Sequence, residues 1–211
     1  MMINKVLSNI SHKKVISNQK KITLDVKIKN KQIFYDLAKI MEKTNGYRKI
    51  LIKIFEDMDK FEFDKASSVT NGDTLFAEYD FTEIKLYEHT LNVFAEMLKI
   101  VDKETQGREV LILLALLHDF GKSNALCKHY KITKEEKHWI RSSQYFNTII
   151  EEDRDFFDLD ETAIQIIRYV LSIHHDSLTT EADKQNRYRN ELVKADRAAR
   201  ESEKLKLKKA V

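Results

Sequence analysis

Residues 110–123 read VLILLALLHDFGKS, in which eight uninterrupted apolar residues are followed directly by His118 and Asp119. An apolar run without a polar face is typical of a helix that other elements enclose. Burial of an unpaired carboxylate is costly, so the Asp119 side chain needs a compensating partner. Two interpretations are open from this stretch alone. The pair binds a metal cation, or Asp119 caps the next turn while His118 fills space in the core.

The composition of the chain bounds its fold class. The 211 residues are 42% hydrophobic and 34% charged, with no proline and four glycines. Sheet-rich folds use proline and glycine in their turns, so this composition predicts an all-α fold with a single core. The formal net charge of +3 gives no global basic field that would by itself indicate nucleic acid.

Cysteine content and hydropathy bear on the compartment and on the kind of metal site. The single cysteine, Cys127, excludes an internal disulfide framework and a cysteine zinc cluster, so histidine and carboxylate must hold any metal. The N-terminal residues are interrupted by polar residues too often for a signal-peptide core, and no apolar run is long enough to span a bilayer. These features predict a cytoplasmic protein with no membrane partner.

A lysine-rich segment precedes the helical part of the chain. Residues 1–31 contain eight lysines and one acidic residue, Asp25. Alternating apolar and polar residues over 22–28 predict a short N-terminal strand or hairpin. This segment is either a basic arm that contacts phosphates or a solvated tail. We expect a basic arm over residues 1–32 and a single helical domain over residues 33–211.

Apolar periodicity predicts helices through most of the remaining chain. Thr133 and Glu136 have the spacing of a capping box, which places a helix start at Thr133. Helices are expected at about residues 33–41, 50–58, 81–101, 133–152, 161–173 and 181–207, with a long loop over 59–80 and a polar turn after Lys122.

Imidazoles and carboxylates lie on the apolar faces or at the ends of these expected helices. Taken singly, His89 is compatible with a core histidine that is hydrogen-bonded to a backbone carbonyl, whereas Asp196 lies on the apolar face of its expected helix, where a solvent carboxylate is not expected. Taken together, the set favours a metal site, because independent core histidines would not so regularly lie at helix ends beside carboxylates. The set consists of His89, His118, Asp119, His138, His174, His175 and Asp196.

The order and spacing of this set resemble the HD-domain metal-dependent phosphohydrolases over about residues 86–200. The resemblance implies an all-α helical bundle. It also implies that one metal ion is bound by the side chains matching the ligands of mononuclear members, which are His89, His118, Asp119 and Asp196.

Binuclear members include HD-GYP cyclic-dinucleotide phosphodiesterases and the HD nuclease domains of CRISPR helicases. They add a lysine four residues after the histidine of the doublet, a single histidine and a histidine pair. These additions match Lys122, His138, and His174 with His175. The resemblance therefore implies a second metal ion on the three histidines, with Asp119 shared between the ions.

The ligand chemistry fits phosphate-ester hydrolysis. Imidazoles and carboxylates without thiolates suit Mn, Fe, Co, Ni, Zn or Mg and do not select among them. Two neighbouring ions lower the pKa of a bridging water, which gives a hydroxide that attacks phosphorus. Asp119 and Lys122 are then the catalytic residues, Lys122 by neutralising charge on the phosphate. The alternative for Lys122 is a solvated lysine at a helix C-terminus.

The chain also departs from parts of the family pattern. The GYP tripeptide is missing after His175, so cyclic-di-GMP specificity is not implied. Lys85 lies four residues before His89, where some members have an acidic ligand, so no third metal is expected. Residues 63–67 and 86–93 show a weaker likeness to HD domains of conjugative relaxases and of a 3′-5′ exoribonuclease.

We expect a metal-dependent phosphohydrolase or phosphodiesterase whose substrate is a nucleotide or nucleic-acid derivative. Ser142 follows His138 by one helical turn and is a candidate substrate contact. Arg197 and Arg200 are further candidates, although pairing with neighbouring glutamates is an equally open interpretation. The full set of candidate substrate contacts is Lys122, Ser142, Arg197 and Arg200.

Two other functional classes remain open. A non-catalytic HD-fold regulatory or signalling module that binds metal or nucleotide would be expected to have lost ligands, whereas every ligand position is filled. An HD-type lyase or oxygenase is disfavoured by Lys122 after the doublet. The sequence does not predict the oligomeric state, the identity of the metal or the substrate.

Overall fold

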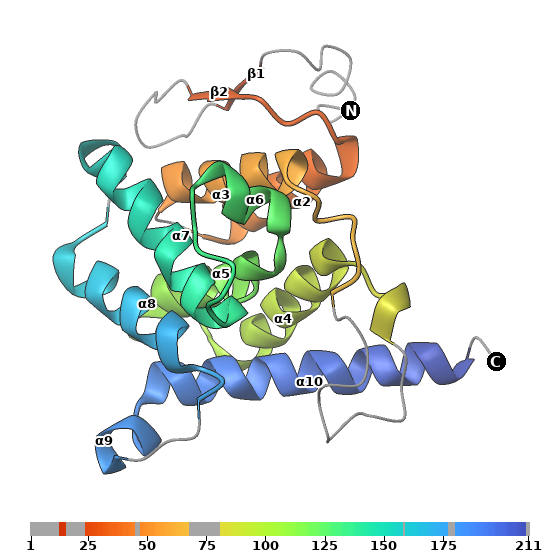
Figure 1. The fold of residues 1–211 in the computed structure, drawn as a ribbon, viewed down its shortest axis with the longest axis vertical. Coiled ribbons are helices and arrows are strands. Elements are labelled where there is room, and N and C mark those ends of the chain that lie inside the picture. The colour runs from red at the N-terminus through yellow and green to blue at the C-terminus, as the bar shows by residue number, and fades with distance from the viewer. Residues whose placement is uncertain are drawn as a thin grey trace.

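Helices make up most of the computed structural model, which describes residues 13–15, 24–44, 47–67, 81–157, 159–176 and 180–209 (Figure 1). The predicted all-α fold is confirmed. The longer helices are α2 (Lys31–Lys43), α3 (Arg48–Lys60), α4 (Leu86–Ile100), α5 (Arg108–Leu117), α7 (His138–Glu152), α8 (Glu161–Ile173) and α10 (Arg187–Lys209). Short helices are α6 (Asn124–His129), α9 (Glu181–Lys184) and the 3-10 helices η1 (Phe81–Glu83), η2 (Phe120–Lys122) and η3 (Arg154–Phe156).

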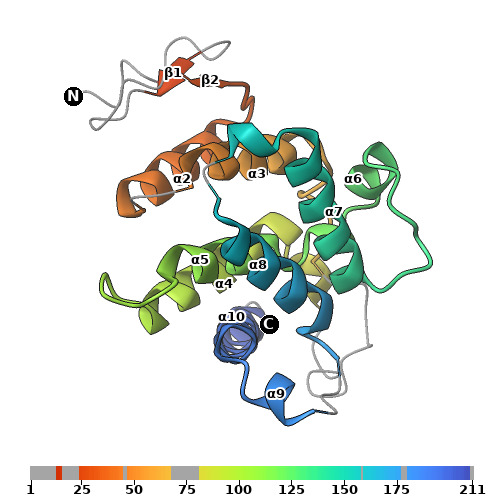
Figure 2. The ribbon, with the colours of Figure 1, turned by 90° about the vertical axis from the view of Figure 1, so that its left-hand side faces the viewer.

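Helix α5 is the centre of the bundle. All eight residues from Val110 to Leu117 are buried, none with more than 5% of its surface exposed. The helix packs against α4, α8 and α10, which lie around it in both views (Figures 1 and 2). The apolar run without a polar face is explained by this enclosure.

Gly107 directly precedes α5 and has a left-handed backbone conformation, with φ of 70°. A Cβ atom at this position would lie 2.4 Å from the Tyr188 hydroxyl on α10. Glycine is therefore favoured here both by the conformation and by the close approach of α10.

A short antiparallel hairpin precedes α2. Strand β1 (Lys13–Val15) pairs with β2 (Leu24–Val26), so the strand predicted over 22–28 is observed over 24–26. Val26 and Ile28 are buried, and the backbone N–H of Lys27 donates to Glu56 Oε1 of α3 at 2.7 Å. This end of the basic segment thus contacts the helical body, and the boundary at residue 32 stays a prediction.

Four predicted element boundaries are wrong. Helix α4 begins at Leu86 rather than at Phe81, since residues 81–83 form only the 3-10 helix η1. Helix α7 begins at His138 rather than at Thr133, because the preceding residues form a turn and the expected capping box does not form. The segment after Lys122 is not only a turn, since α6 forms there with the Ser123 hydroxyl accepting from the Leu126 N–H at 3.1 Å. The last helix is divided into α9 and α10.

The structure describes only the first part of the long loop predicted over residues 59–80. Asp59 and Lys60 belong to α3, and residues 68–80 of the predicted loop lie outside the described residues. Helix α10 is the longest described helix and carries many charged side chains. Within the described ranges, no helix combines the length and the apolar character needed to cross a membrane.

Candidate metal centre

The predicted ligands converge from five elements of the bundle. His89 lies inside α4 and Asp196 inside α10, while the remaining ligands lie at helix ends. They form two groups, and within each group the candidate ligand atoms lie within 4.8 Å of one another. One group is His89, His118 and Asp196, and the other is Asp119, His138, His174 and His175.

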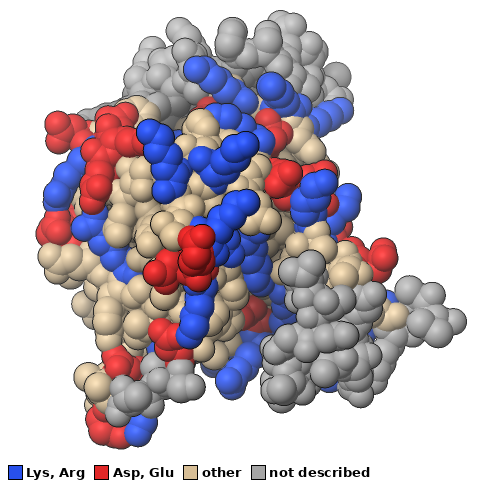
Figure 3. Space-filling model, viewed as in Figure 1, with Lys and Arg blue, Asp and Glu red and all other residues tan. Residues whose placement is uncertain are grey.

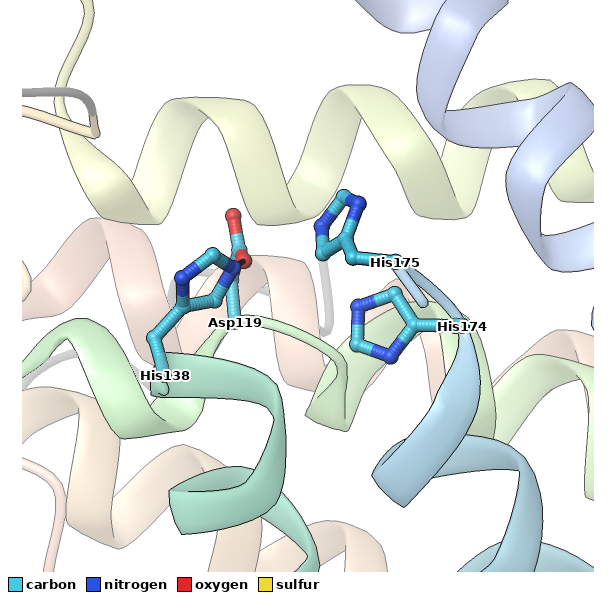
Figure 4. A group of neighbouring side chains, drawn as sticks. All are labelled: Asp119, His138, His174 and His175. Atoms are coloured by element: carbon cyan, nitrogen blue, oxygen red, sulfur yellow. Dashed lines mark ion pairs between the residues drawn. The ribbon is translucent and has the colours of Figure 1, made fainter. Parts of the chain in front are cut away.

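The second group joins the ends of three elements (Figure 4). His138 is the first residue of α7, and His174 directly follows the last residue of α8. Figure 4 shows Asp119 beside His138, with His174 and His175 close by on the end of α8. Because α7 begins at His138 rather than five residues earlier, the imidazole stands at the open end of the helix and not on its side.

Asp119 lies between the two groups. Its Oδ2 atom is 3.4 Å from His89 Nε2 and 3.3 Å from His118 Nε2. Its Oδ1 atom is 3.3 Å from His138 Nε2, in the other group. The carboxylate is 1% exposed. Each oxygen therefore faces a different group, an arrangement suited to a ligand shared by two ions.

Backbone carbonyls orient two of the histidines. His118 Nδ1 lies 3.0 Å from the Ala115 carbonyl, and His174 Nδ1 lies 2.9 Å from the Leu171 carbonyl. These carbonyls belong to the last turns of α5 and α8, where the helix leaves carbonyl groups without an intrahelical donor. A carbonyl only accepts, so each Nδ1–H donates and each Nε2 is left for another partner.

Five buried side-chain atoms that face the centre lack hydrogen-bond partners among the described residues. Buried polar atoms are normally paired, and a cluster of unpaired ones at a single place needs an explanation. A bound divalent cation provides one, since imidazole nitrogens and carboxylate oxygens are its ordinary ligands. The residues present therefore fit a metal centre. The unpaired atoms are Nε2 of His89, His118, His138 and His174, together with Oδ1 of Asp119.

The electrostatics of the second group favour the ligand forms of its side chains. Burial, followed by the charges of His175 and His118, lowers the pKa of His174 well below its usual value. Burial also lowers the pKa of His138. For Asp119, burial acts to raise the pKa, but the charges of His118 and Lys122 outweigh it and hold the pKa well below its usual range. Neutral imidazoles and an ionised carboxylate are the forms that bind metal.

Gly121 and Ser142 connect η2 to the start of α7. A Cβ atom on Gly121 would lie 2.0 Å from the His138 carbonyl oxygen, so only glycine permits this approach. The Ser142 hydroxyl accepts from the Gly121 N–H at 2.9 Å and donates to the His118 carbonyl at 2.7 Å. Ser142 is fully buried, and these contacts tie the two ligand-bearing segments together. A substrate contact at Ser142 stays a prediction.

The predicted basic contacts occupy different environments. Lys122 Nζ donates to Asp119 Oδ2 at 2.7 Å and is 23% exposed. Arg200 Nη1 donates to Glu203 Oε2 at 2.9 Å, which is the pairing left open by the sequence. Arg197 lies exposed on α10. Phosphate contacts by these three residues stay predictions.

Two residues around the centre were missed by the reasoning from sequence. Glu203 is fully buried, and its Oε1 lies 2.9 Å from His89 Nδ1. Its signal was its position seven residues after Asp196, which places both on one face of a helix. The Trp139 ring lies 5.0 Å from the His138 ring and 5.3 Å from the His175 ring, centroid to centroid. Its signal was its position next to His138.

A comparison with protein-family models matches residues 86–208 to the HD domain, which is more than half of the chain. The chain belongs to the HD-domain family, as the sequence pattern predicted. Proteins of this family bind divalent metals and are mostly metal-dependent hydrolases. The matched range contains every predicted metal ligand. No curated protein and no solved structure matches the chain.

Proposed function

We propose that the protein is a phosphodiesterase or phosphohydrolase with a centre for two divalent ions. The observation that carries this proposal is the position of Asp119, whose two oxygens face two different groups of candidate ligands. A shared carboxylate between two ions is a common arrangement for hydrolysis of phosphate esters. The ion is one of Mn, Fe, Co, Ni, Zn or Mg, since the ligand set has no thiolate.

The chain's own residues prepare the centre before substrate arrives. His89, His118 and Asp196 would hold one ion, and the second group would hold the other with Asp119 shared. Divalent ions, when bound, lower the pKa of water and neutralise phosphoryl oxygens. Lys122 is placed at the partly exposed edge of the centre, where its ammonium group can stabilise charge that develops on a phosphate.

A nucleotide or nucleic-acid derivative is the proposed substrate class. Basic and acidic side chains are interspersed on the face shown in Figure 3, so this face has no uniform basic surface. The choice of substrate class therefore does not rest on surface charge. Support comes instead from the charge of Lys122 beside Asp119 and from Trp139 beside the second group. An aromatic ring next to a phosphate site suits substrates that carry a base, because every base can stack on it.

The proposal is tested by hydrolysis assays on metal-free protein reloaded with Mn²⁺. The panel contains bis-p-nitrophenyl phosphate, mononucleotides, cyclic dinucleotides, single-stranded DNA and RNA. We expect metal-dependent hydrolysis that Asp119→Ala abolishes and that Asp155→Ala, a change at an exposed carboxylate on η3, leaves unchanged. Metal binding without hydrolysis of any panel member would instead support a regulatory module that binds metal or nucleotide.

A further inference from the structure

We infer that Glu203 is a positioning residue for the metal centre. Its carboxylate accepts a hydrogen bond from His89 Nδ1–H, so that His89 Nε2 is presented to the ion. The inference rests on the proposed metal centre and deepens it. It assigns a role to a buried carboxylate of α10 that is not itself one of the candidate ligands.

The His89 ring lies between two carboxylates of a single helix. Its Nε2 is 3.2 Å from Asp196 Oδ1, and its Nδ1 is 2.9 Å from Glu203 Oε1. Seven residues separate the two acids, which corresponds to about two turns or ~10 Å of helix. Helix α10 lies along α4 in the bundle (Figure 1). A single helix therefore supplies one acid to each nitrogen of the ring.

Position along α4 explains why His89 needs an acceptor from another element. His118 and His174 follow the last residues of their helices and use carbonyls that the helix leaves free. His89 lies in the first half of α4. There the backbone N–H of His89 donates to the Lys85 carbonyl at 3.0 Å, and the carbonyls after Lys85 accept from backbone N–H groups within the helix. A side chain from another helix must therefore accept from its Nδ1.

Glu203 is itself held in one orientation. Its Oε1 also accepts from Asn92 Nδ2 at 2.8 Å, and its Oε2 accepts from Arg200 Nη1 at 2.9 Å. Arg200 Nη1 donates in addition to the Ser67 hydroxyl at 3.0 Å. Both carboxylate oxygens are thus fixed by neighbours, and a fixed acceptor fixes the imidazole. Carboxylates in this role orient a metal-binding histidine and raise its basicity more than a carbonyl does.

The test is calorimetric titration of metal-free protein with Mn²⁺. Relative to wild type, Glu203→Ala is expected to weaken one of the two binding events by about 10- to 100-fold while the other is retained. Glu203→Gln is expected to weaken it less, because the amide oxygen still accepts from Nδ1–H. Glu201→Gln is the matched control, an exposed glutamate two residues away, and is expected to bind as wild type does.

A measurement on the wild-type protein tests the inference even if Glu203→Ala fails to fold. Nitrogen-detected NMR of the Zn²⁺-loaded protein, with His89 assigned from a His89→Gln spectrum, is expected to show a protonated Nδ1 and a coordinated Nε2. Coordination through Nδ1 would overturn the inference, and so would Mn²⁺ affinities of a folded Glu203→Ala equal to those of wild type.

The outcomes separate this inference from the proposed function. Wild-type protein that binds Mn²⁺ but hydrolyses no phosphate ester refutes the proposed activity, while loss of affinity in Glu203→Ala still supports the role of Glu203. Metal-dependent hydrolysis together with unchanged metal binding in Glu203→Ala refutes the role of Glu203 alone.

Discussion

The Asp119 carboxylate meets the imidazole of its sequence neighbour His118 and imidazoles from distant parts of the chain. His89 and His118 approach one oxygen and His138 approaches the other, all within 3.4 Å. A carboxylate in such surroundings stays ionised although it is buried, because the neighbouring charges outweigh the cost of desolvation. Lys122 forms an ion pair with Asp119. We expect the two side chains to have different roles, Asp119 in metal binding and Lys122 in catalysis.

Replacement of Lys122 by alanine should separate metal binding from catalysis. Lys122 contacts Asp119 but offers no ligand atom, since an ammonium group has no lone pair to donate. We expect Lys122→Ala to keep its Mn²⁺ stoichiometry, measured by elemental analysis, and to lose about 10²- to 10³-fold in kcat. Lys128→Ala, at an exposed position on α6, is the control. Loss of the metal in Lys122→Ala would contradict this division of roles.

At the scale of elements, the site depends on close contacts between helix ends. Helix η2 lies against the first turn of α7 through Gly121, and the Ser142 hydroxyl joins their backbones. A second network links α3, the residue that directly follows α6, and α7. In it, Asp57 Oδ2 accepts from the hydroxyls of Tyr130 and Tyr145, each at 2.8 Å.

Gly121→Ala is expected to destabilise the fold by about 1–3 kcal/mol, because the added methyl group meets backbone that cannot rotate away. Urea unfolding followed by circular dichroism measures the change. Asn124→Ala, at the exposed start of α6, serves as the control. A Gly121→Ala protein as stable as wild type would show that η2 and α7 are not in the contact described.

Tyr145→Phe tests the network around Asp57. Burial, together with the Asp57 charge, raises the pKa of Tyr145 well above its usual value, so the hydroxyl stays protonated and donates. Its removal leaves a buried carboxylate with one donor fewer, which should cost about 1.5–3 kcal/mol in the free energy of unfolding. The Tyr145 ring also stacks on Phe120 of η2, a contact that phenylalanine keeps. A Tyr145→Phe protein as stable as wild type would contradict a stabilising hydrogen bond from Tyr145 to Asp57.

At the scale of the whole molecule, the candidate centre connects most of the bundle. Its ligands come from α4, α10 and the ends of α5, α7 and α8, which are far apart along the chain. An ion bound there stabilises the folded state, because the unfolded chain does not assemble the same ligands.

Metal binding should therefore raise the thermal stability of the protein. At a free Mn²⁺ concentration of 100 times the Kd, the gain is about 2.7 kcal/mol for each site. Thermal melts with Mn²⁺ and with chelator measure it as a difference in Tm. Asp119→Ala should show a much smaller difference, and an identical Tm for wild type under both conditions would contradict the metal centre.

The sequence by itself determined the helical class, the enclosed α5 and the set of imidazoles and carboxylates, because periodicity and residue type are local properties. The tertiary structure decided what depends on contacts between distant residues. It divided the ligands into two groups on either side of Asp119, required glycine at position 121 and brought Glu203 to His89. It also moved the start of α7 to His138, since packing against η2 prevails over a capping signal worth only about 1 kcal/mol.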